Sequence, residues 1–197
     1  DKDITNSFSK ITEFLPEVSK SLRVIPYYGP NHTAVVTYIQ IGELKLILGA
    51  DLEESKDPNC GWQSIVNSSV LLEKEIDIIK ISHHGSSNGH CEKLWTDFLI
   101  TTPHALITPY TRSKLPKNED IDRILNKTDK AFCTSHPDSK MKHVQDSAVE
   151  KTIKEVAKSY KVYKESIGQI KLFKENAGSE LSVELLQTAK HLKEFKR

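Results

Sequence analysis

The chain has 197 residues, which suits one domain, or one domain with a helical appendage. Its 28 Lys+Arg and 27 Asp+Glu leave a net charge of +1, which excludes a uniformly basic nucleic-acid-binding protein but not a local basic patch. No stretch approaches the roughly 18 apolar residues of a membrane span, so we expect no membrane segment in this chain. The three cysteines, Cys60, Cys91 and Cys133, include no CxxC pair. An odd number of dispersed cysteines argues against a disulfide scaffold and favours a reducing, cytoplasmic location.

In chain order, apolar spacing predicts a helix over residues 4–20 and a strand over residues 22–28. A β-hairpin follows, with strands over residues 33–41 and 44–48 and a two-residue Gly42-Glu43 turn. Further strands are expected over residues 76–81, 105–108 and 130–134, and helices over residues 62–68, 92–99 and 119–126. This alternation of strands and helices around one core predicts the α/β class.

Towards the C-terminus, the Lys-, Glu- and Ala-rich residues 145–160 predict a solvated helix, and residues 168–173 and 180–186 predict a terminal hairpin. Residues 190–197 are expected to form a basic tail, a solvated helix end that offers contacts to an acidic partner or nucleic acid.

One strand end carries a carboxylate that a strand does not need. Asp51 follows an apolar run and Gly49, so its side chain is expected at the edge of a buried sheet. Desolvating a carboxylate there costs several kcal/mol unless a partner neutralises it, and a divalent metal is such a partner. A plain helix cap is the alternative for Asp51 taken alone.

A second strand end carries the sequence His83-His84-Gly85-Ser86-Ser87-Asn88-Gly89-His90. Two imidazoles on a turn rich in Gly, Ser and Asn offer neutral nitrogen ligands. Because adjacent residues leave an extended backbone in opposite directions, one imidazole is expected to face the metal and the other solvent, substrate or a supporting acceptor. A pair of surface histidines in a turn is the alternative.

Taken together, the motifs Gly49-Ala50-Asp51-Leu52-Glu53 and His83-His84-Gly85-Ser86 resemble the metallo-β-lactamase superfamily, and within it the branch of ComEC-type hydrolase domains. The hairpin before the first motif, the Lys80-Ile81-Ser82 lead into the second and the closing Gly168-Gln169-Ile170 also follow the order in such domains.

The resemblance implies a four-layer αββα fold, of which this chain holds only the C-terminal half. Residues 1–197 would form that half, with a core at residues 22–135 and 165–192 and a helical insertion at residues 138–164. It also implies one or two divalent metal ions, Zn or Mn, with Asp51 bridging the metals and a histidine of the turn as the last ligand. We expect His83, which comes first after the strand, with His84 close behind.

The remaining site residues are expected around the substrate. Ser86, Ser87 and Asn88 would position it, and His90 would support a ligand or contact the substrate.

The superfamily's main signature, HxHxDH, is absent from this chain. Because a catalytic zinc usually needs three protein ligands, either an upstream segment carries the signature or the chain is a non-catalytic remnant. The first residue, Asp1, is not Met, and in this fold the signature comes first. We therefore expect the N-terminal half of the same fold, from the same gene or a separate chain, as the principal partner.

The sequence thus favours a metal-dependent hydrolase, a phosphodiesterase or nuclease that uses a metal-activated hydroxide, with nucleic acid as a possible partner. A lactone, β-lactam or thioester hydrolase of the same fold is the second hypothesis. A binding or scaffolding module without catalysis is the third.

Overall fold

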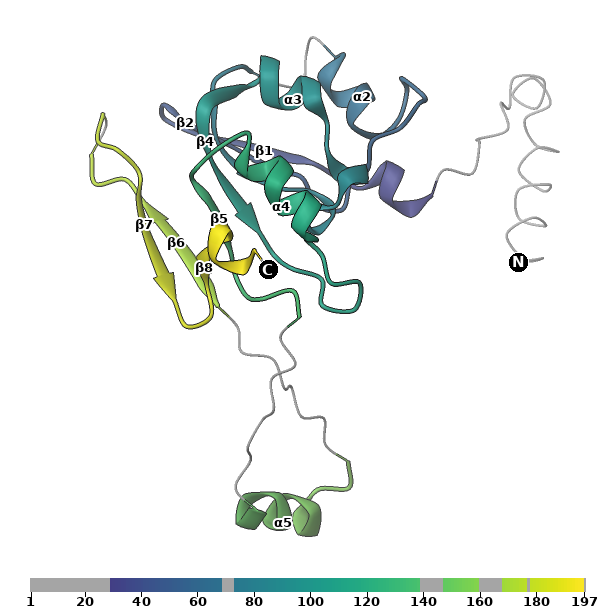
Figure 1. Cartoon of the computed structure of the whole chain (residues 1–197), viewed down its shortest axis with the longest axis vertical. Coiled ribbons are helices and arrows are strands. Elements are labelled where there is room, and N and C mark those ends of the chain that lie inside the picture. Colours follow the sequence, from purple (N-terminus) through teal and green to yellow (C-terminus); the bar gives the residue numbers. More distant parts are fainter. Residues whose placement is uncertain (1–28, 69–72, 139–146, 160–167, 177, 197) are drawn as a thin grey trace, which may run out of the picture.

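The computed structural model describes residues 29–68, 73–138, 147–159, 168–176 and 178–196 (Figure 1). The helix and strand predicted for residues 4–20 and 22–28 lie outside the described residues.

The described residues form one six-stranded mixed sheet and a separate two-stranded hairpin. The sheet order is β1-β2-β3-β4-β5-β8, in which β2 to β5 run parallel and the outer strands β1 and β8 are antiparallel to their neighbours. The predicted α/β class is confirmed. The strands are β1 Thr37–Ile41, β2 Leu44–Leu48, β3 Ile76–Lys80, β4 Leu99–Ile107, β5 Ala131–Cys133 and β8 Lys190–His191.

The predicted hairpin of β1 and β2 is observed in the expected register. Thr37 pairs with Leu48 and Ile41 with Leu44, around a turn in which Gly42 has a φ of 60°. The second predicted hairpin is also present, as β6 Gln169–Phe173 and β7 Ser182–Leu186.

One face of the sheet carries the hydrophobic core. Ile47 and Ile107 from the strands pack with Trp62, Leu94 and Ile121 from three helices, and all five are almost fully buried. The helices are α2 Gly61–Val66, α3 Glu92–Asp97 and α4 Asn118–Leu125, with short 3-10 helices η1 Pro30–Thr33, η2 His83–Gly85, η3 Ser87–Gly89 and η4 Leu192–Phe195. The helix predicted for residues 145–160 is α5 Ser147–Val156.

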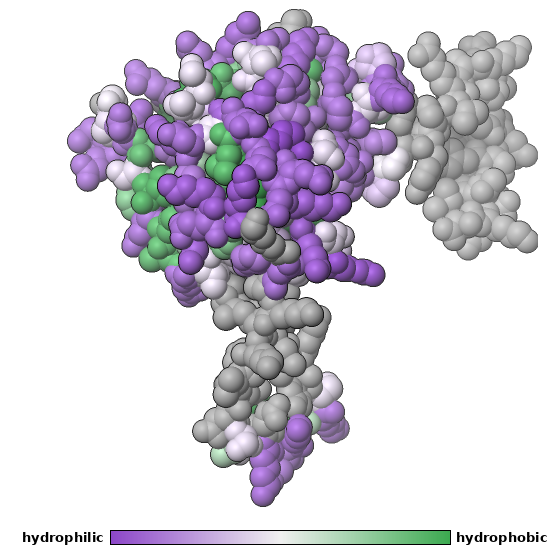
Figure 2. Space-filling model, in the orientation of Figure 1, coloured by the Kyte–Doolittle hydropathy of each residue, from purple (hydrophilic) through white to green (hydrophobic). Residues whose placement is uncertain are grey.

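The opposite face of the sheet is apolar but only partly covered by the described residues. Strand register places Ile39, Leu46 and Ile78 side by side on it, and Ile41 at its border is 65% exposed. A hollow lined by Ile41, Leu44 and residues 174–176 places the end of the β6–β7 hairpin next to the β1–β2 turn. Hydrophobic side chains gather in the region of that hairpin (Figure 2). Apolar surface of this kind is typical of a face that packs against another layer.

The structure of the C-terminal residues differs from the predicted basic tail. Lys190 and His191 extend the sheet as β8, and Leu192 and Phe195 in η4 are buried, at 0% and 6% exposure. The prediction of a solvated helix end was wrong because Leu192 and Phe195 lie three residues apart, on the same face of the short helix. Their burial outweighs the many lysines around them.

Within the parts of the chain that the structure describes, we find no helix with the length and apolarity that crossing a membrane requires.

The packing of the sheet predicts the reactivity of two thiols. Burial raises the pKa of both Cys91 and Cys133 to about 11. Because the thiolate is the reactive form, iodoacetamide at pH 8 should alkylate both residues far more slowly in the folded protein than in urea-unfolded protein. Peptide mass spectrometry at timed intervals measures this. Equal rates in the two states would show that β5 and the start of α3 are not packed as described.

Candidate functional site

Two neighbouring parallel strands deliver the candidate residues to one edge of the sheet. β2 leads into Gly49-Ala50-Asp51, and β3 leads into Ile81-Ser82-His83. The two segments are joined by backbone hydrogen bonds, from Gly49 N to Lys80 O at 2.9 Å and from His83 N to Ala50 O at 3.0 Å. Since the carboxyl ends of parallel strands lie at the same edge of a sheet, the two motifs share one rim.

Gly49 permits this close approach. A Cβ atom at this position would lie 2.8 Å from the Cβ of Ser82 and 3.0 Å from the carbonyl oxygen of Lys80. Any side chain at residue 49 would therefore push the two segments apart.

The structure brings the Asp51 carboxylate and the His84 imidazole together. His84 Nε2 lies 3.4 Å from Asp51 Oδ1, with side chains that are 24% and 52% exposed respectively. On the other side of the ring, His84 Nδ1 lies 2.9 Å from the carbonyl oxygen of Thr108. Tyr110 stacks on the imidazole at a centroid distance of 5.1 Å. Three residues from two segments thus contact one imidazole.

The Thr108 contact determines the tautomer of a neutral His84. A carbonyl oxygen only accepts hydrogen bonds, so Nδ1 must carry the proton and donate it. Nε2 then presents a lone pair to the Asp51 carboxylate. Two electron-donating atoms face each other, which is the arrangement of two ligands of one cation.

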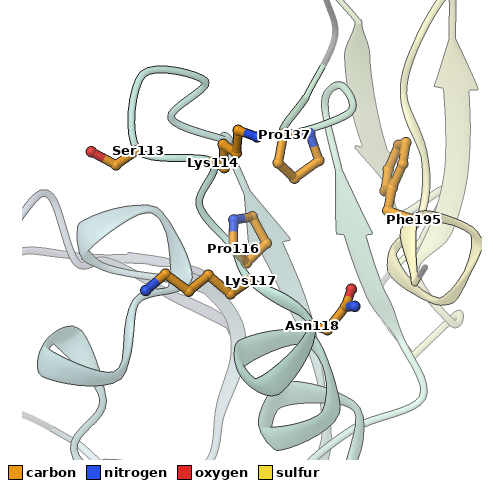
Figure 3. A pocket seen from close by; sticks show the side chains of 7 residues that line it. All are labelled: Ser113, Lys114, Pro116, Lys117, Asn118, Pro137 and Phe195. Atoms are coloured by element: carbon orange, nitrogen blue, oxygen red, sulfur yellow. The ribbon is translucent and has the colours of Figure 1, made fainter.

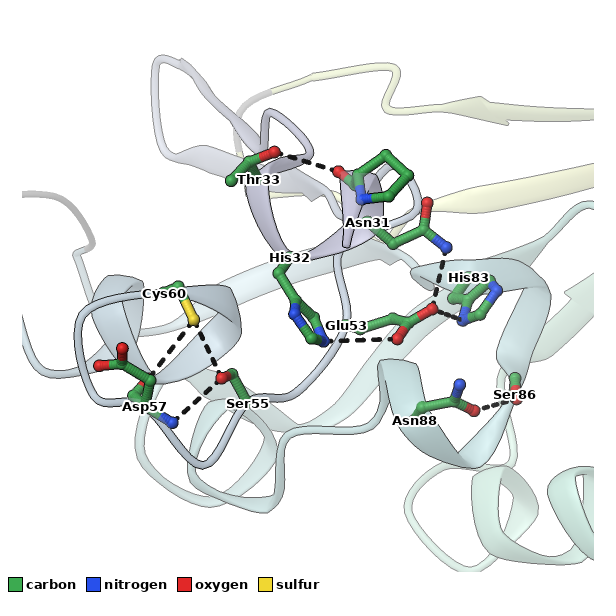
Figure 4. A network of polar contacts seen from close by, with 11 residues as sticks. Asn31, His32, Thr33, Glu53, Ser55, Asp57, Cys60, His83, Ser86 and Asn88 are labelled. Carbon is green, nitrogen blue, oxygen red and sulfur yellow. Dashed lines mark hydrogen bonds and ion pairs between the residues drawn. The ribbon is translucent and has the colours of Figure 1, made fainter. Parts of the chain in front are cut away.

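His83 points to a different acid, Glu53 (Figure 4). His83 Nδ1 lies 3.2 Å from Glu53 Oε1, a distance typical of an ion pair. Glu53 also accepts a hydrogen bond from Asn31 Nδ2 at 2.9 Å and lies 3.6 Å from His32 Nε2. We expected His83 to face Asp51; in the structure His84 has this position, while His83 joins the Glu53 cluster. Sequence reasoning did not predict this cluster.

The turn has an unusual backbone. Ala50, His83 and His84 have φ values of 46°, 46° and 55°, in the left-handed region that favours glycine. Each such residue costs about 1–3 kcal/mol and persists only where its surroundings hold it. Here the Gly85 and Ser86 amides donate to the carbonyls of Ser82 and His83, both at 3.0 Å. The strain is concentrated where the candidate ligands are.

A buried hydroxyl anchors the turn to the core. Trp62 Nε1 donates to Ser82 Oγ at 3.1 Å, and Ser82 Oγ donates to the Gly89 carbonyl at 2.7 Å. Trp62 is 0% exposed and Ser82 is 2% exposed. The hydrogen bonds therefore connect α2, the end of β3 and the end of η3 without solvent access.

The residues expected to contact substrate lie on the same turn, but not all face Asp51. Ser86 Oγ donates to Asn88 Oδ1 at 2.6 Å, while Ser87 and Asn88 are exposed. His90 Nε2 instead lies 3.1 Å from Glu92 Oε2, and its ring stacks on Trp95. Burial lowers the pKa of His90.

A separate cavity of about 280 Å³ lies between the start of α4 and η4 (Figure 3). Pro116, Pro137 and Phe195 form its apolar wall, and Lys114 and Lys117 contribute positive charge. The described residues that line it include no carboxylate or imidazole, unlike those of the Asp51 rim.

The described residues do not contain a complete metal site. Among residues 29–68, 73–138, 147–159, 168–176 and 178–196, no group of three or more His, Cys, Asp or Glu side chains is placed to hold a metal ion. Asp51 and His84 form a pair of candidate ligands, one fewer than a catalytic zinc requires.

Comparison with known proteins gives no further assignment. The chain matches no protein-family model, no curated protein and no solved structure.

The buried hydroxyl of Ser82 can be tested by Ser82→Ala. Losing this hydroxyl leaves the buried Trp62 N–H and the Gly89 carbonyl without their partner. We expect the free energy of unfolding to fall by about 1–3 kcal/mol. Urea denaturation followed by tryptophan fluorescence measures this. Unchanged stability would mean that water replaces the hydroxyl and that this residue does not anchor the turn.

The close approach at Gly49 gives a second test, Gly49→Ala. The added methyl group would meet Ser82 and the Lys80 carbonyl, so we expect a loss of about 1–3 kcal/mol and a displaced turn. Gly29→Ala is the matched control, because a Cβ atom there meets no atom of the described residues within 4 Å. Thermal melts of both variants give the comparison, and equal melting temperatures would contradict the packing of the two segments.

Proposed function

We propose that this chain is the C-terminal half of a metal-dependent hydrolase of the metallo-β-lactamase type, with phosphodiesterase or nuclease activity. The observation that carries the proposal is the pair of facing donors, Asp51 Oδ1 and His84 Nε2. Their chemistry, carboxylate oxygen and imidazole nitrogen, suits zinc or manganese.

The spacing of the two donor atoms supports the proposal. Zinc bonds of about 2.0–2.1 Å and a tetrahedral angle of about 109° separate two ligand atoms by about 3.3–3.4 Å. Asp51 Oδ1 and His84 Nε2 are 3.4 Å apart. The hydrogen bond from the other ring nitrogen to the Thr108 carbonyl is the supporting contact that metal-binding histidines make.

The proposal assigns distinct tasks to the residues of the rim. Asp51 and His84 would hold the metal, and Thr108 and Tyr110 would keep the imidazole oriented. The Glu53 cluster would hold the turn from its other side through His83. When bound, one or two divalent ions would supply a Lewis acid and activate water for attack on a phosphoryl centre.

The missing ligands define the proposed partner. Asp51 and His84 do not complete a catalytic metal centre, so the proposal includes a segment with the HxHxDH signature as the N-terminal half of the fold. The four-layer αββα architecture is part of the same proposal. It is supported by the partly covered apolar sheet face and by the β6–β7 hairpin beside the β1–β2 turn.

A cytoplasmic location completes the proposal. Cys60, Cys91 and Cys133 are free and buried in the structure, as is usual in a reducing compartment.

The test uses the protein expressed from its complete gene. We expect bound zinc or manganese in elemental analysis after dialysis, and hydrolysis of bis(4-nitrophenyl) phosphate and single-stranded DNA. Asp51→Asn and His84→Gln each remove a ligand. They should therefore lower both metal content and hydrolysis, the latter by more than about 100-fold, beyond the usual effect of a supporting residue.

The control is Asp97→Asn, which removes an exposed carboxylate that bonds only Thr96 among the described residues. It should leave metal content and activity unchanged. A protein that binds no transition metal, or a His84→Gln variant with full metal content, would contradict the proposal. If the protein hydrolyses 4-nitrophenyl acetate or a β-lactam but no phosphodiester, the proposed metal site would stand, and the proposed substrate class would change to esters or lactams.

A further inference from the structure

Lys80 lies at the end of β3, on the sheet face opposite the core. Its register neighbours on this face are Leu48 of β2 and Leu106 of β4. A lysine between two leucines at the carboxyl end of parallel strands places a positive charge between apolar neighbours, beside the Asp51 rim. Within the part of the chain that the structure describes, the Lys80 ammonium donates no hydrogen bond to the β1–β2 hairpin or to the pair of candidate ligands, Asp51 and His84.

A cavity of about 430 Å³ opens at this position. Its lining includes Lys80 and Asp51, the hydroxyl residues Thr37 and Thr108, and the apolar side chains of Val35 and Leu48. Among the described residues that line it, Lys80 is the only cationic one and Asp51 the only carboxylate. Lys80 and the carboxylate that is proposed to hold the metal thus line the same cavity, together with apolar side chains.

The Lys80 ammonium is not neutralised by the described part of the chain. Its Nζ donates one hydrogen bond, to the Ile81 carbonyl at 3.1 Å, and no carboxylate of the described residues lies within ion-pair distance of it. An ammonium group has three donors, so two are available to a ligand. Burial lowers the pKa of Lys80, while the more distant charge of Asp51 acts in the opposite direction.

We propose that Lys80 binds a non-bridging phosphate oxygen of the substrate in this cavity, next to the metal held by Asp51 and His84. This inference rests on the proposed function. A phosphodiester carries one negative charge that the ammonium would pair with, and a charge-assisted hydrogen bond would orient it. The apolar walls formed by Val35 and Leu48 would contact the substituents of the diester. Lys80 is then a substrate-binding residue rather than a structural one.

The experiment separates binding from hydrolysis. Isothermal titration calorimetry measures the affinity of bis(4-nitrophenyl) phosphate for the protein from the complete gene after metal removal with EDTA. Lys80→Met keeps most of the length of the side chain but removes its charge, and it should raise Kd by at least about 10-fold, within the strength of a hydrogen bond to a charged group. Lys80→Arg should stay within about 3-fold of the wild type. Lys171→Met, which alters an exposed lysine on β6 that pairs with Glu184, should change nothing.

Stability distinguishes a binding role from a structural one. Removing a partly desolvated ammonium without a carboxylate partner should leave the melting temperature of Lys80→Met unchanged or raise it. If Lys80→Met melts at a lower temperature, Lys80→Gln, which keeps a polar end, is titrated in its place. In the metal-loaded protein, Lys80→Met should raise KM for the diester and leave hydrolysis of the neutral ester 4-nitrophenyl acetate unaltered.

Absence of diester binding to the wild type, or wild-type affinity in both uncharged variants, would overturn the Lys80 site. Loss of affinity and of thermal stability together in both uncharged variants would also overturn it. Lys80-dependent binding by a protein that hydrolyses no phosphodiester with any metal would overturn the proposed function and leave the anion site in place.

Discussion

The contact between Asp51 and His84 is unfavourable unless a positive charge lies on or between them. The Thr108 carbonyl accepts a hydrogen bond from Nδ1 of a neutral His84. The lone pair of Nε2 then faces the Asp51 carboxylate at 3.4 Å. Rotating the ring away would break the bond to Thr108 and the stacking on Tyr110. Position, tautomer and orientation of the imidazole are all fixed before any ligand binds, which is the preorganisation that a metal site requires.

Maintaining that position requires a strained backbone. Three non-glycine residues at the rim have positive φ values, and the two histidines are consecutive. The surrounding structure counters this strain with short, buried contacts: the Ser82 hydroxyl between Trp62 and Gly89, and the close approach at Gly49. In a turn with only a structural role, glycine at these positions would adopt the same backbone angles at a lower free-energy cost. That histidines occupy them is a physical argument for function.

Local patterns in the sequence predicted most of the described strands and helices. Alternating β-branched residues around Gly42-Glu43 specify the β1–β2 hairpin, and the apolar runs before residues 49 and 82 specify two strands that end in polar turns. The choice between His83 and His84 could not be made from the sequence, because the alternation rule holds only for an extended backbone. Both residues adopt left-handed angles. The pairing of His32 with Glu53 joins segments 21 residues apart, and only the tertiary fold shows it.

The described structure has an incomplete set of candidate metal ligands and a partly uncovered sheet face, and one additional layer would complete both. The rim offers two candidate metal ligands where a catalytic zinc needs three, and the sheet exposes apolar side chains such as Ile41 on the face that carries Lys80. A second sheet packed on that face would bury the apolar surface. Its own strand ends would then lie at the rim, since stacked sheets are only about 10 Å apart. In the proposed architecture, a segment that packs on this face would therefore also be placed to complete the ligand set.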